Sequence, residues 1–250
     1  MAPRIAIPMP HSTDHEYAAR ALPQYQRAVV IAGGEPVPIP LNVAPAELRS
    51  LIRSCNGVLL PGSNADVDPT RFRQEKSPHT ATADPRREEV DDFLLDYAYA
   101  HRQPVLGICY GLQSLNVFRG GSLIPHIPDF LPENTRAKVN HEAGKKVPVA
   151  HTVSIEAGSR LAQIIADGQP LAPERDALIV PVNSSHHQSA KIIGDGLRLV
   201  ARCPDDGIIE ALGGTATDHF VLAVQWHPER SVEDDEHSTH IFRALVDAAR

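Results

Sequence analysis

Residues 104–121 constrain the fold more than any other part of the chain. The apolar run at 104–108 is typical of a buried strand, and Cys109 follows it at once. Residues 112–118 then show helical spacing of apolar side chains until Gly120 ends the helix. A strand that turns directly into a helix is typical of α/β folds, because parallel neighbours in a sheet need a helical crossover.

The N-terminal half repeats this alternation of strands and helices. Strands are predicted at 4–8, 35–40 and 57–60, and helices at 16–32, 44–54 and 85–100. In the last of these helices, spacings of three and four predict one apolar face, made of Val90, Phe93, Leu94, Tyr97 and Ala98. Residues 64–83 are rich in Asp, Pro, Ser and Thr, and are predicted to form a long ordered loop near the carboxyl ends of the strands.

The C-terminal half is richer in predicted strands. They lie at 149–155, 178–183, 197–203, 208–212 and 220–225, and a last amphipathic helix is predicted at 238–249. The whole pattern predicts an α/β fold with a mostly parallel central sheet and an additional small β-rich region. At 250 residues, we expect residues 1–250 to form a single domain.

Charge and hydropathy exclude several classes of protein. The formal net charge is −7 and there is no basic run, which argues against nucleic acid or an anionic membrane surface as partners. No apolar stretch approaches the roughly 20 residues needed to span a bilayer, and residues 1–10 lack the features of a secretory signal. We expect a cytoplasmic protein that binds a small molecule, and leave open whether it forms a homodimer.

The cysteines and histidines do not predict a metal site. Cys55, Cys109 and Cys203 are an odd number without C-x-x-C spacing, so at least one thiol within the chain is free. Among 13 histidines there is no H-E-x-x-H motif, and the adjacent pair His186-His187 cannot share a helix face as i, i+4 ligands can. No metal site is therefore expected.

Cys109 stands in the sequence Gly107-Ile108-Cys109-Tyr110-Gly111, with a glycine two positions away on each side. This is the pattern of a nucleophile elbow, in which a sharp turn strains the backbone of the nucleophile and glycines let strand and helix approach. The turn also places the sulfur at a helix N-terminus, where an anion is stabilised. The alternative is a small buried core residue, which is common for free cysteine.

A thiol nucleophile needs a base, and the best candidate is His227 in Val224-Gln225-Trp226-His227-Pro228-Glu229. Glu229 would orient the imidazole and stabilise its protonated form. Backbone N–H groups of Gly62, after the strand at 57–60, and of Tyr110, after the cysteine, could bind an oxyanion. Each motif alone has a simpler interpretation: a surface histidine with a solvated glutamate, and an ordinary turn.

Two of these motifs, GICYGLQSLN and QWHPE, together resemble the class I glutamine amidotransferase superfamily over most of the chain. The resemblance is closer to the γ-glutamyl-γ-aminobutyrate hydrolases, also described as a C26-type peptidase family. It is carried by six blocks in order: LPGSNADVDP, DPRREEVDDFLLDYA, PVLGICYGLQSLNVFRGGSLIPHI, VNSSHHQSAK, GLRLVARCPDDGIIEAL and AVQWHPE.

The resemblance implies a cofactor-free, flavodoxin-like three-layer sandwich that cleaves a γ-glutamyl amide bond and releases glutamate and an amine. It assigns a triad of Cys109, His227 and Glu229 and an oxyanion hole at the backbones of Gly62 and Tyr110. It also places the γ-glutamyl substrate against Gln113, Asn183, Ser184, His186, His187 and Gln188.

Gln113, one helical turn past the cysteine, could hydrogen-bond the α-amino or α-carboxylate group of a glutamyl substrate. His186, His187 and Gln188 could lie over the leaving amine, or could form a polar turn packed on the surface. Residues 127–146 are expected to shape access to the substrate.

Two alternatives to a stand-alone hydrolase stay open. One is a glutaminase subunit that supplies ammonia to a separate synthase, and the other is a non-catalytic γ-glutamyl-binding protein on the same fold. The absence of any G-x-S-x-G motif argues against a serine hydrolase.

Overall fold

The computed structural model describes residues 1–169 and 176–250. Its strands are β1 Arg4–Pro8, β2 Glu35–Ile39, β3 Gly57–Leu60, β4 Val105–Ile108, β5 Ser122–Ile124, β6 His151–Glu156, β7 Ala177–Val182, β8 Ser189–Ile192, β9 Leu197–Arg202, β10 Ile209–Gly214 and β11 Val221–Val224. Its α-helices are α1 His15–Ile31, α2 Pro45–Arg53, α3 Pro85–His101, α4 Tyr110–Phe118, α5 Ile127–Phe130, α6 Glu133–Arg136, α7 Arg160–Ile165 and α8 Glu236–Ala248. The predicted α/β fold is confirmed.

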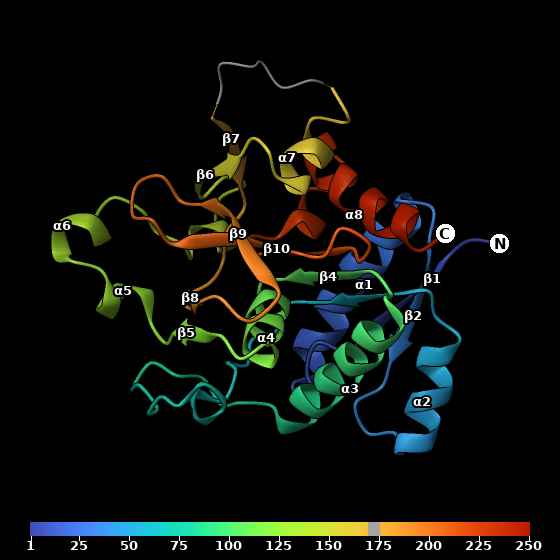
Figure 1. Cartoon of the computed structure of the whole chain (residues 1–250). Coiled ribbons are helices and arrows are strands. Elements are labelled where there is room, and N and C mark those ends of the chain that lie inside the picture. Colours follow the sequence, from blue (N-terminus) through green and yellow to red (C-terminus); the bar gives the residue numbers. More distant parts are fainter. Residues whose placement is uncertain (170–175) are drawn as a thin grey trace.

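One large sheet runs through the described residues in the order β2-β1-β3-β4-β11-β10-β9-β6-β7 (Figure 1). The first five strands are parallel, and the other four continue the sheet in antiparallel pairs. The β-rich second half of the sequence therefore extends the parallel sheet. A separate two-stranded antiparallel sheet joins β5 and β8.

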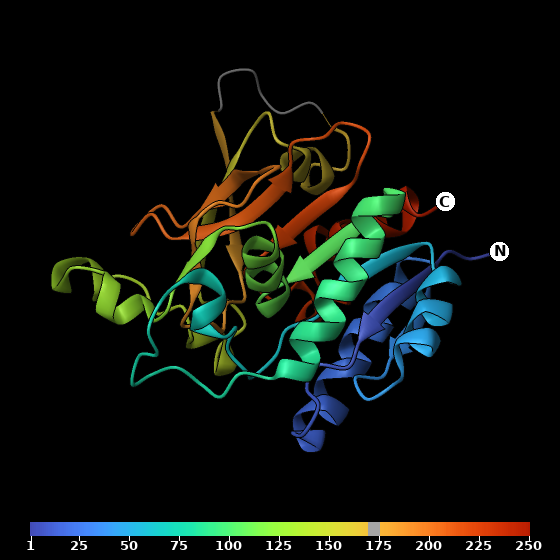
Figure 2. The same ribbon diagram turned by 60° about the horizontal axis from the view of Figure 1, so that its bottom comes forward.

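Helices cover both faces of the sheet (Figures 1 and 2). Buried side chains of α1, α7 and α8 pack on one face, and those of α2, α3 and α4 pack on the other. The parallel strands β3, β4 and β11 are buried along their whole length, as expected for strands covered on both sides.

The interpretation of residues 85–100 needs a correction. Helix α3 begins and ends close to the prediction, but the face that it buries is not simply apolar. Arg87 and Asp91 are both fully buried and form an ion pair of 2.7 Å, whereas Phe93 and Tyr97 are only partly buried. Charged residues are rarely buried unless they are paired, so spacing of apolar residues alone could not identify this face.

The short elements β5, β8, α5, α6 and α7 were not predicted. Each has six residues or fewer, and the three helices among them are too short for a helical repeat to stand out. The loop at 64–83 is confirmed apart from a 3-10 helix at Pro69–Phe72.

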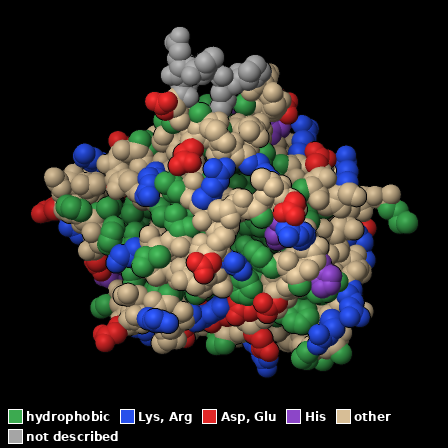
Figure 3. Space-filling model, viewed as in Figure 1, with side chains coloured by type: hydrophobic (Ala, Val, Ile, Leu, Met, Phe, Trp, Pro, Cys, Tyr) green, Lys and Arg blue, Asp and Glu red, His purple; other side chains and the backbone are tan. Residues whose placement is uncertain are grey.

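No α-helix in the described part of the chain has the length and apolar character to cross a bilayer. On the face that Figure 3 shows, Lys and Arg side chains are interspersed with Asp and Glu, without a continuous basic patch.

Candidate active site

Cys109 lies at the sharp turn between β4 and α4, with backbone angles φ 53° and ψ −105°. A non-glycine residue with positive φ is strained and persists only where its surroundings hold it. The flanking glycines are required by close contacts: a Cβ on Gly111 would lie 2.2 Å from the carbonyl oxygen of Leu60, and one on Gly107 would lie 2.7 Å from that of Gly111. Strand β3 and helix α4 thus pack directly against the turn.

The pairing of β4 with β11 brings the motif that contains His227 and Glu229 to the edge of the sheet where Cys109 lies. The two strands are parallel, with Val224 opposite Ile108, and the N–H of Cys109 donates to the carbonyl of Val224 at 2.8 Å. Because parallel strands end together, the chain after β11 leaves the sheet beside Cys109. His227 is held there by its own N–H, which donates to the carbonyl of Asn183 at 2.8 Å.

His227 and Glu229 are buried and share a hydrogen bond of 2.7 Å between Nδ1 and Oε1. The imidazole also lies close to the cysteine: a Cβ on Gly62 would be 3.2 Å from Cε1 of His227 and 3.7 Å from Cβ of Cys109. With Nδ1 turned to Glu229, the second ring nitrogen remains for Cys109. The structure therefore brings the three residues of the predicted triad together.

The electrostatics of this group are strongly coupled. Burial lowers the pKa of His227, but the charges of Glu229 and Cys109 and hydrogen bonds to both side chains raise it overall to about 9. Burial raises the pKa of Glu229, and its contacts with His227 and Arg230 more than offset this, so the carboxyl pKa lies below its usual value. The geometry thus favours a carboxylate that stabilises a protonated imidazole.

The two predicted oxyanion donors differ in their partners. The N–H of Gly62 donates to the hydroxyl of Tyr25 at 3.0 Å in the buried wall of the site. The N–H of Tyr110 stands at the first position of α4, where the helix offers it no acceptor. An oxyanion would therefore compete with no helix acceptor at the Tyr110 amide, whereas at the Gly62 amide it would have to replace the hydroxyl of Tyr25.

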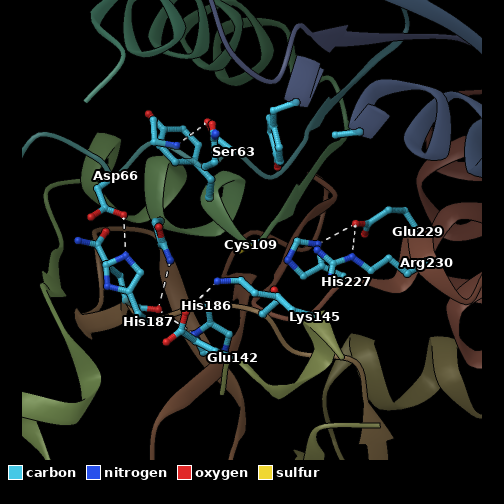
Figure 4. Close-up of a pocket in the computed structure, with 18 of the residues that line it drawn as sticks. Ser63, Asp66, Cys109, Glu142, Lys145, His186, His187, His227, Glu229 and Arg230 are labelled. Atoms are coloured by element: carbon cyan, nitrogen blue, oxygen red, sulfur yellow. Dashed lines mark hydrogen bonds and ion pairs between the residues drawn. The ribbon is translucent and has the colours of Figure 1, made fainter. Parts of the chain in front are cut away.

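A cavity of about 670 Å³ opens onto Cys109, His227 and Glu229. Figure 4 shows His227, Glu229 and Arg230 at one end of this cavity and Asp66 with His187 at the other. Charges of both signs line it, including five residues that sequence reasoning did not identify: Arg20, Asp66, Glu142, Lys145 and Arg230. Glu142 and Lys145 belong to the segment 127–146, which was expected to shape access to the substrate.

Four of the six predicted substrate-binding residues line the cavity: Gln113, His186, His187 and Gln188. The amide of Gln113 donates to the carbonyl of Gln188 at 3.2 Å and to the side chain of Gln225 at 3.3 Å. His187 contacts Asp66 through Nε2 at 3.1 Å. These contacts fix the orientation of the cavity wall.

Asn183 and Ser184 lie behind this wall. The amide of Asn183 donates to the carbonyls of Gly144, Val147 and Pro148, and its side-chain oxygen accepts from Arg230. Ser184 is completely buried. Both residues are placed to hold the segments that carry the cavity lining.

Signals in the sequence for the missed cavity residues were weak. Arg20 lies on helix α1, Asp66 and Glu142 lie in loops, and Lys145 ends the short 3-10 helix Ala143–Lys145. Two clues were available: Arg230 directly follows the QWHPE block, and Asp66 lies within the LPGSNADVDP block.

The same fold occurs in solved structures that share little sequence with this chain. Solved structures with this fold include the glutaminase domain of Trypanosoma brucei CTPS with bound acivicin, at a TM-score of 0.62 and 18% identity, covering 99% of this chain and 93% of that one. Another is PurLQS from Thermotoga maritima, at a TM-score of 0.60 and 16% identity, covering both chains completely.

The family follows from sequence comparison. The family model for Peptidase C26 matches residues 5–229, and the chain belongs to this family. It is 32% identical to the γ-glutamyl-γ-aminobutyrate hydrolase of Escherichia coli O157:H7 over 99% of this chain and 94% of that protein. The predicted resemblance is confirmed.

A Mycobacterium tuberculosis protein with a provisional glutamine amidotransferase name is 38% identical over 90% of this chain. The match covers 66% of that relative's length, slightly less than two thirds. Together these relatives support an activity on a γ-glutamyl amide bond, either as a hydrolase or as an amidotransferase.

Proposed function

We propose that this protein hydrolyses the γ-glutamyl amide bond of a small γ-glutamyl amine, with Cys109 as nucleophile, His227 as base and Glu229 as the residue that orients the imidazole. The observation that carries this proposal is the hydrogen-bonded His227–Glu229 pair beside a strained cysteine, at the floor of a cavity with charges of both signs. A non-catalytic binding protein would need none of these three side chains.

In the first half-reaction, the thiol proton passes to His227 and the sulfur of Cys109 attacks the amide carbon. The negative charge on the carbonyl oxygen is stabilised by hydrogen bonds from the N–H groups of Tyr110 and Gly62. The N–H of Gly62 leaves the hydroxyl of Tyr25 to donate to this oxyanion. The C–N bond then breaks, and the amine leaves with the proton held by His227. The product is a γ-glutamyl thioester on the sulfur.

In the second half-reaction, His227 accepts a proton from water, and the hydroxyl oxygen attacks the thioester carbon. The C–S bond breaks, glutamate leaves, and the sulfur recovers its proton from the imidazole. The charge of Glu229 stabilises the imidazolium in both halves.

The charges around the cavity support a γ-glutamyl substrate. This group carries an α-carboxylate and an α-ammonium, so its site needs both cationic and anionic side chains. Arg230 and Lys145 supply positive charge, and Asp66 and Glu142 supply negative charge. A volume of about 670 Å³ lies within the roughly 300–1,000 Å³ usual for small-molecule pockets.

The experiment is a screen of γ-glutamyl amines and short γ-glutamyl peptides, with free glutamine as the reference substrate. Wild-type protein should turn over at least one γ-glutamyl amine faster than glutamine. Cys109→Ser should lower kcat by about 10³-fold or more. Cys55→Ser is the matched control because this second buried cysteine packs under α2, away from the cavity. Turnover that survives Cys109→Ser would overturn the assignment of the nucleophile.

The glutamine amidotransferase names among the relatives favour one second candidate, a glutaminase that supplies ammonia to a separate synthase. Hydrolysis of glutamine with no turnover of any γ-glutamyl amine would support this candidate over the stand-alone hydrolase.

A further inference from the structure

A cluster of three histidines and one glutamate lies next to the cavity and has no part in the chemistry proposed above. His141 comes from the loop after α6, His151 from β6, His186 from the loop before β8, and Glu210 from β10. Their exposed fractions are 5%, 8%, 3% and 0%. Four segments that are distant in the sequence thus converge on one point in the interior.

Each histidine turns one ring nitrogen toward Glu210. Oε1 of this carboxylate lies 3.1 Å from Nδ1 of His141, 3.4 Å from Nε2 of His151 and 3.5 Å from Nε2 of His186. No hydrogen bond satisfies these three nitrogens or either oxygen of Glu210 within the described residues. Unsatisfied polar atoms in an interior are unusual and call for an explanation.

The outer nitrogen of each histidine contacts a group that can only accept a hydrogen bond. Nε2 of His141 contacts the carboxylate of Asp206 at 2.8 Å. Nδ1 of His151 contacts the carbonyl of Thr152 at 3.0 Å, and Nδ1 of His186 contacts that of Gln188 at 2.9 Å. The outer nitrogens therefore carry protons, and a ring without a second proton presents a lone pair to the centre.

With all three rings in this form, three lone pairs and a carboxylate face one another, and a cation between them would be bound by all four groups. Histidines whose second nitrogen donates to a carboxylate or carbonyl are typical of metal ligands, since this contact fixes the tautomer and the ring orientation. The contact between His141 and Asp206 is of the carboxylate–histidine kind, and the other two use backbone carbonyls.

We propose that His141, His151, His186 and Glu210 bind one divalent transition-metal cation, with Zn²⁺ as the best fit. Zn²⁺ prefers four tetrahedral nitrogen, oxygen or sulfur ligands at about 2.0–2.1 Å, which puts ligand atoms about 3.3 Å apart. The three distances from Glu210 Oε1, at 3.1–3.5 Å, bracket that separation. All four ligands come from the buried protein interior, which is typical of a structural site.

Such a metal would hold the wall of the candidate active site in place. His141 is followed directly by Glu142, and His186 by His187, and both of these neighbours line the cavity. The segment 137–150 has only one short 3-10 helix, Ala143–Lys145, to order it. A cross-link from His141 to β6 and β10 would fix this segment against the large sheet.

The test is the metal content of the full-length protein, measured by inductively coupled plasma mass spectrometry after incubation with Zn²⁺ and dialysis. Wild type should retain about one Zn²⁺ per chain. Glu210→Gln and His151→Ala should each lower the retained Zn²⁺ at least tenfold. Because either variant could fail to fold, thermal unfolding of wild type is measured as well: Zn²⁺ should raise its Tm, and a strong chelator should lower it.

Two control variants separate this cluster from neighbouring ligand groups. His79→Ala disrupts the exposed group His79, His126 and Asp129, and Cys203→Ser disrupts the group of His141, Cys203 and Asp206. Both should retain the metal. The Co²⁺-substituted protein should show a tetrahedral ligand-field spectrum without a thiolate charge-transfer band. Wild type that retains no Zn²⁺ and shows no change of Tm would overturn the proposal, whatever its activity on γ-glutamyl amines.

Discussion

Gly111→Ala should test whether the turn at Cys109 depends on the close approach of β3 and α4. The added Cβ would lie 2.2 Å from the carbonyl oxygen of Leu60, 2.8 Å from its Cβ and 2.9 Å from its carbonyl carbon. Two of these three atoms belong to the backbone of the buried strand β3, so no side-chain rotation can relieve the contact.

The expected loss of stability follows from how far α4 and β3 must move apart to admit the added Cβ. An ordinary contact begins near 3.4 Å, so helix α4 or strand β3 must move by roughly 1 Å. Overpacking of a buried site lowers the free energy of unfolding by about 1–3 kcal/mol and occasionally more. Because the close contact here is with backbone atoms, we expect a loss of about 3 kcal/mol. For a chain of this size, that loss lowers Tm by about 6–12 °C. A displacement of about 1 Å at the nucleophile should lower kcat about 10²-fold.

The assay compares Gly111→Ala with Gly158→Ala, whose added Cβ meets nothing within 4 Å. Free energies of unfolding come from urea titrations followed by circular dichroism, and kcat from the best γ-glutamyl substrate. The control should match wild type or gain a few tenths of a kcal/mol. A Gly111→Ala protein with wild-type stability and kcat would show that β3 and α4 do not meet as described.

Further substitutions at three places test the groups around the site. Glu229→Gln should lower kcat by about 10²–10⁴-fold. Because the pKa of His227 is raised from 6.5 to about 9, its stabilising contribution is complete below pH 6.5 and is lost as the pH rises through about 9. The free energy of unfolding of wild type should therefore fall over this range relative to Glu229→Gln. Arg87→Met should lower the free energy of unfolding, measured by urea titration, by about 3–5 kcal/mol, because Asp91 loses its buried ion-pair partner. The double variant Arg87→Met, Asp91→Leu should lose less of this free energy. Tyr25→Phe should leave kcat unchanged or raise it, and a hundredfold fall would show that the phenol itself is required.

The strand–cysteine–helix element was predictable because its determinants are local. A buried strand, a turn that needs glycine on both sides, and a helical repeat all fall within residues 104–121. The position of His227 beside Cys109 depends in addition on β11 pairing with β4, which the sequence order of the strands does not specify. The resemblance to a known family assigned the two residues to one triad without specifying this pairing.

Most of the cavity wall could not be predicted, because loops build it and other loops hold them. Asn183 illustrates the reason: its side chain binds three carbonyls in the segment 144–148, and its backbone carbonyl accepts from His227. A sequence motif indicates that such a residue lies near a ligand. It does not distinguish a side chain that contacts the ligand from one that fixes its neighbours.

Sequence analysis could not identify the buried charged residues, for a related reason. Hydrophobic spacing assigns Arg87 to solvent, yet its guanidinium donates to the carbonyl of Pro61 at 2.7 Å and lies 4.8 Å from the centre of the Tyr110 ring. Arg87 thus joins the loop that carries Gly62 to the helix that carries Tyr110. The two candidate oxyanion amides come from different crossovers of the sheet, and a buried cation between them fixes their separation more firmly than apolar packing could, because its hydrogen bonds have direction.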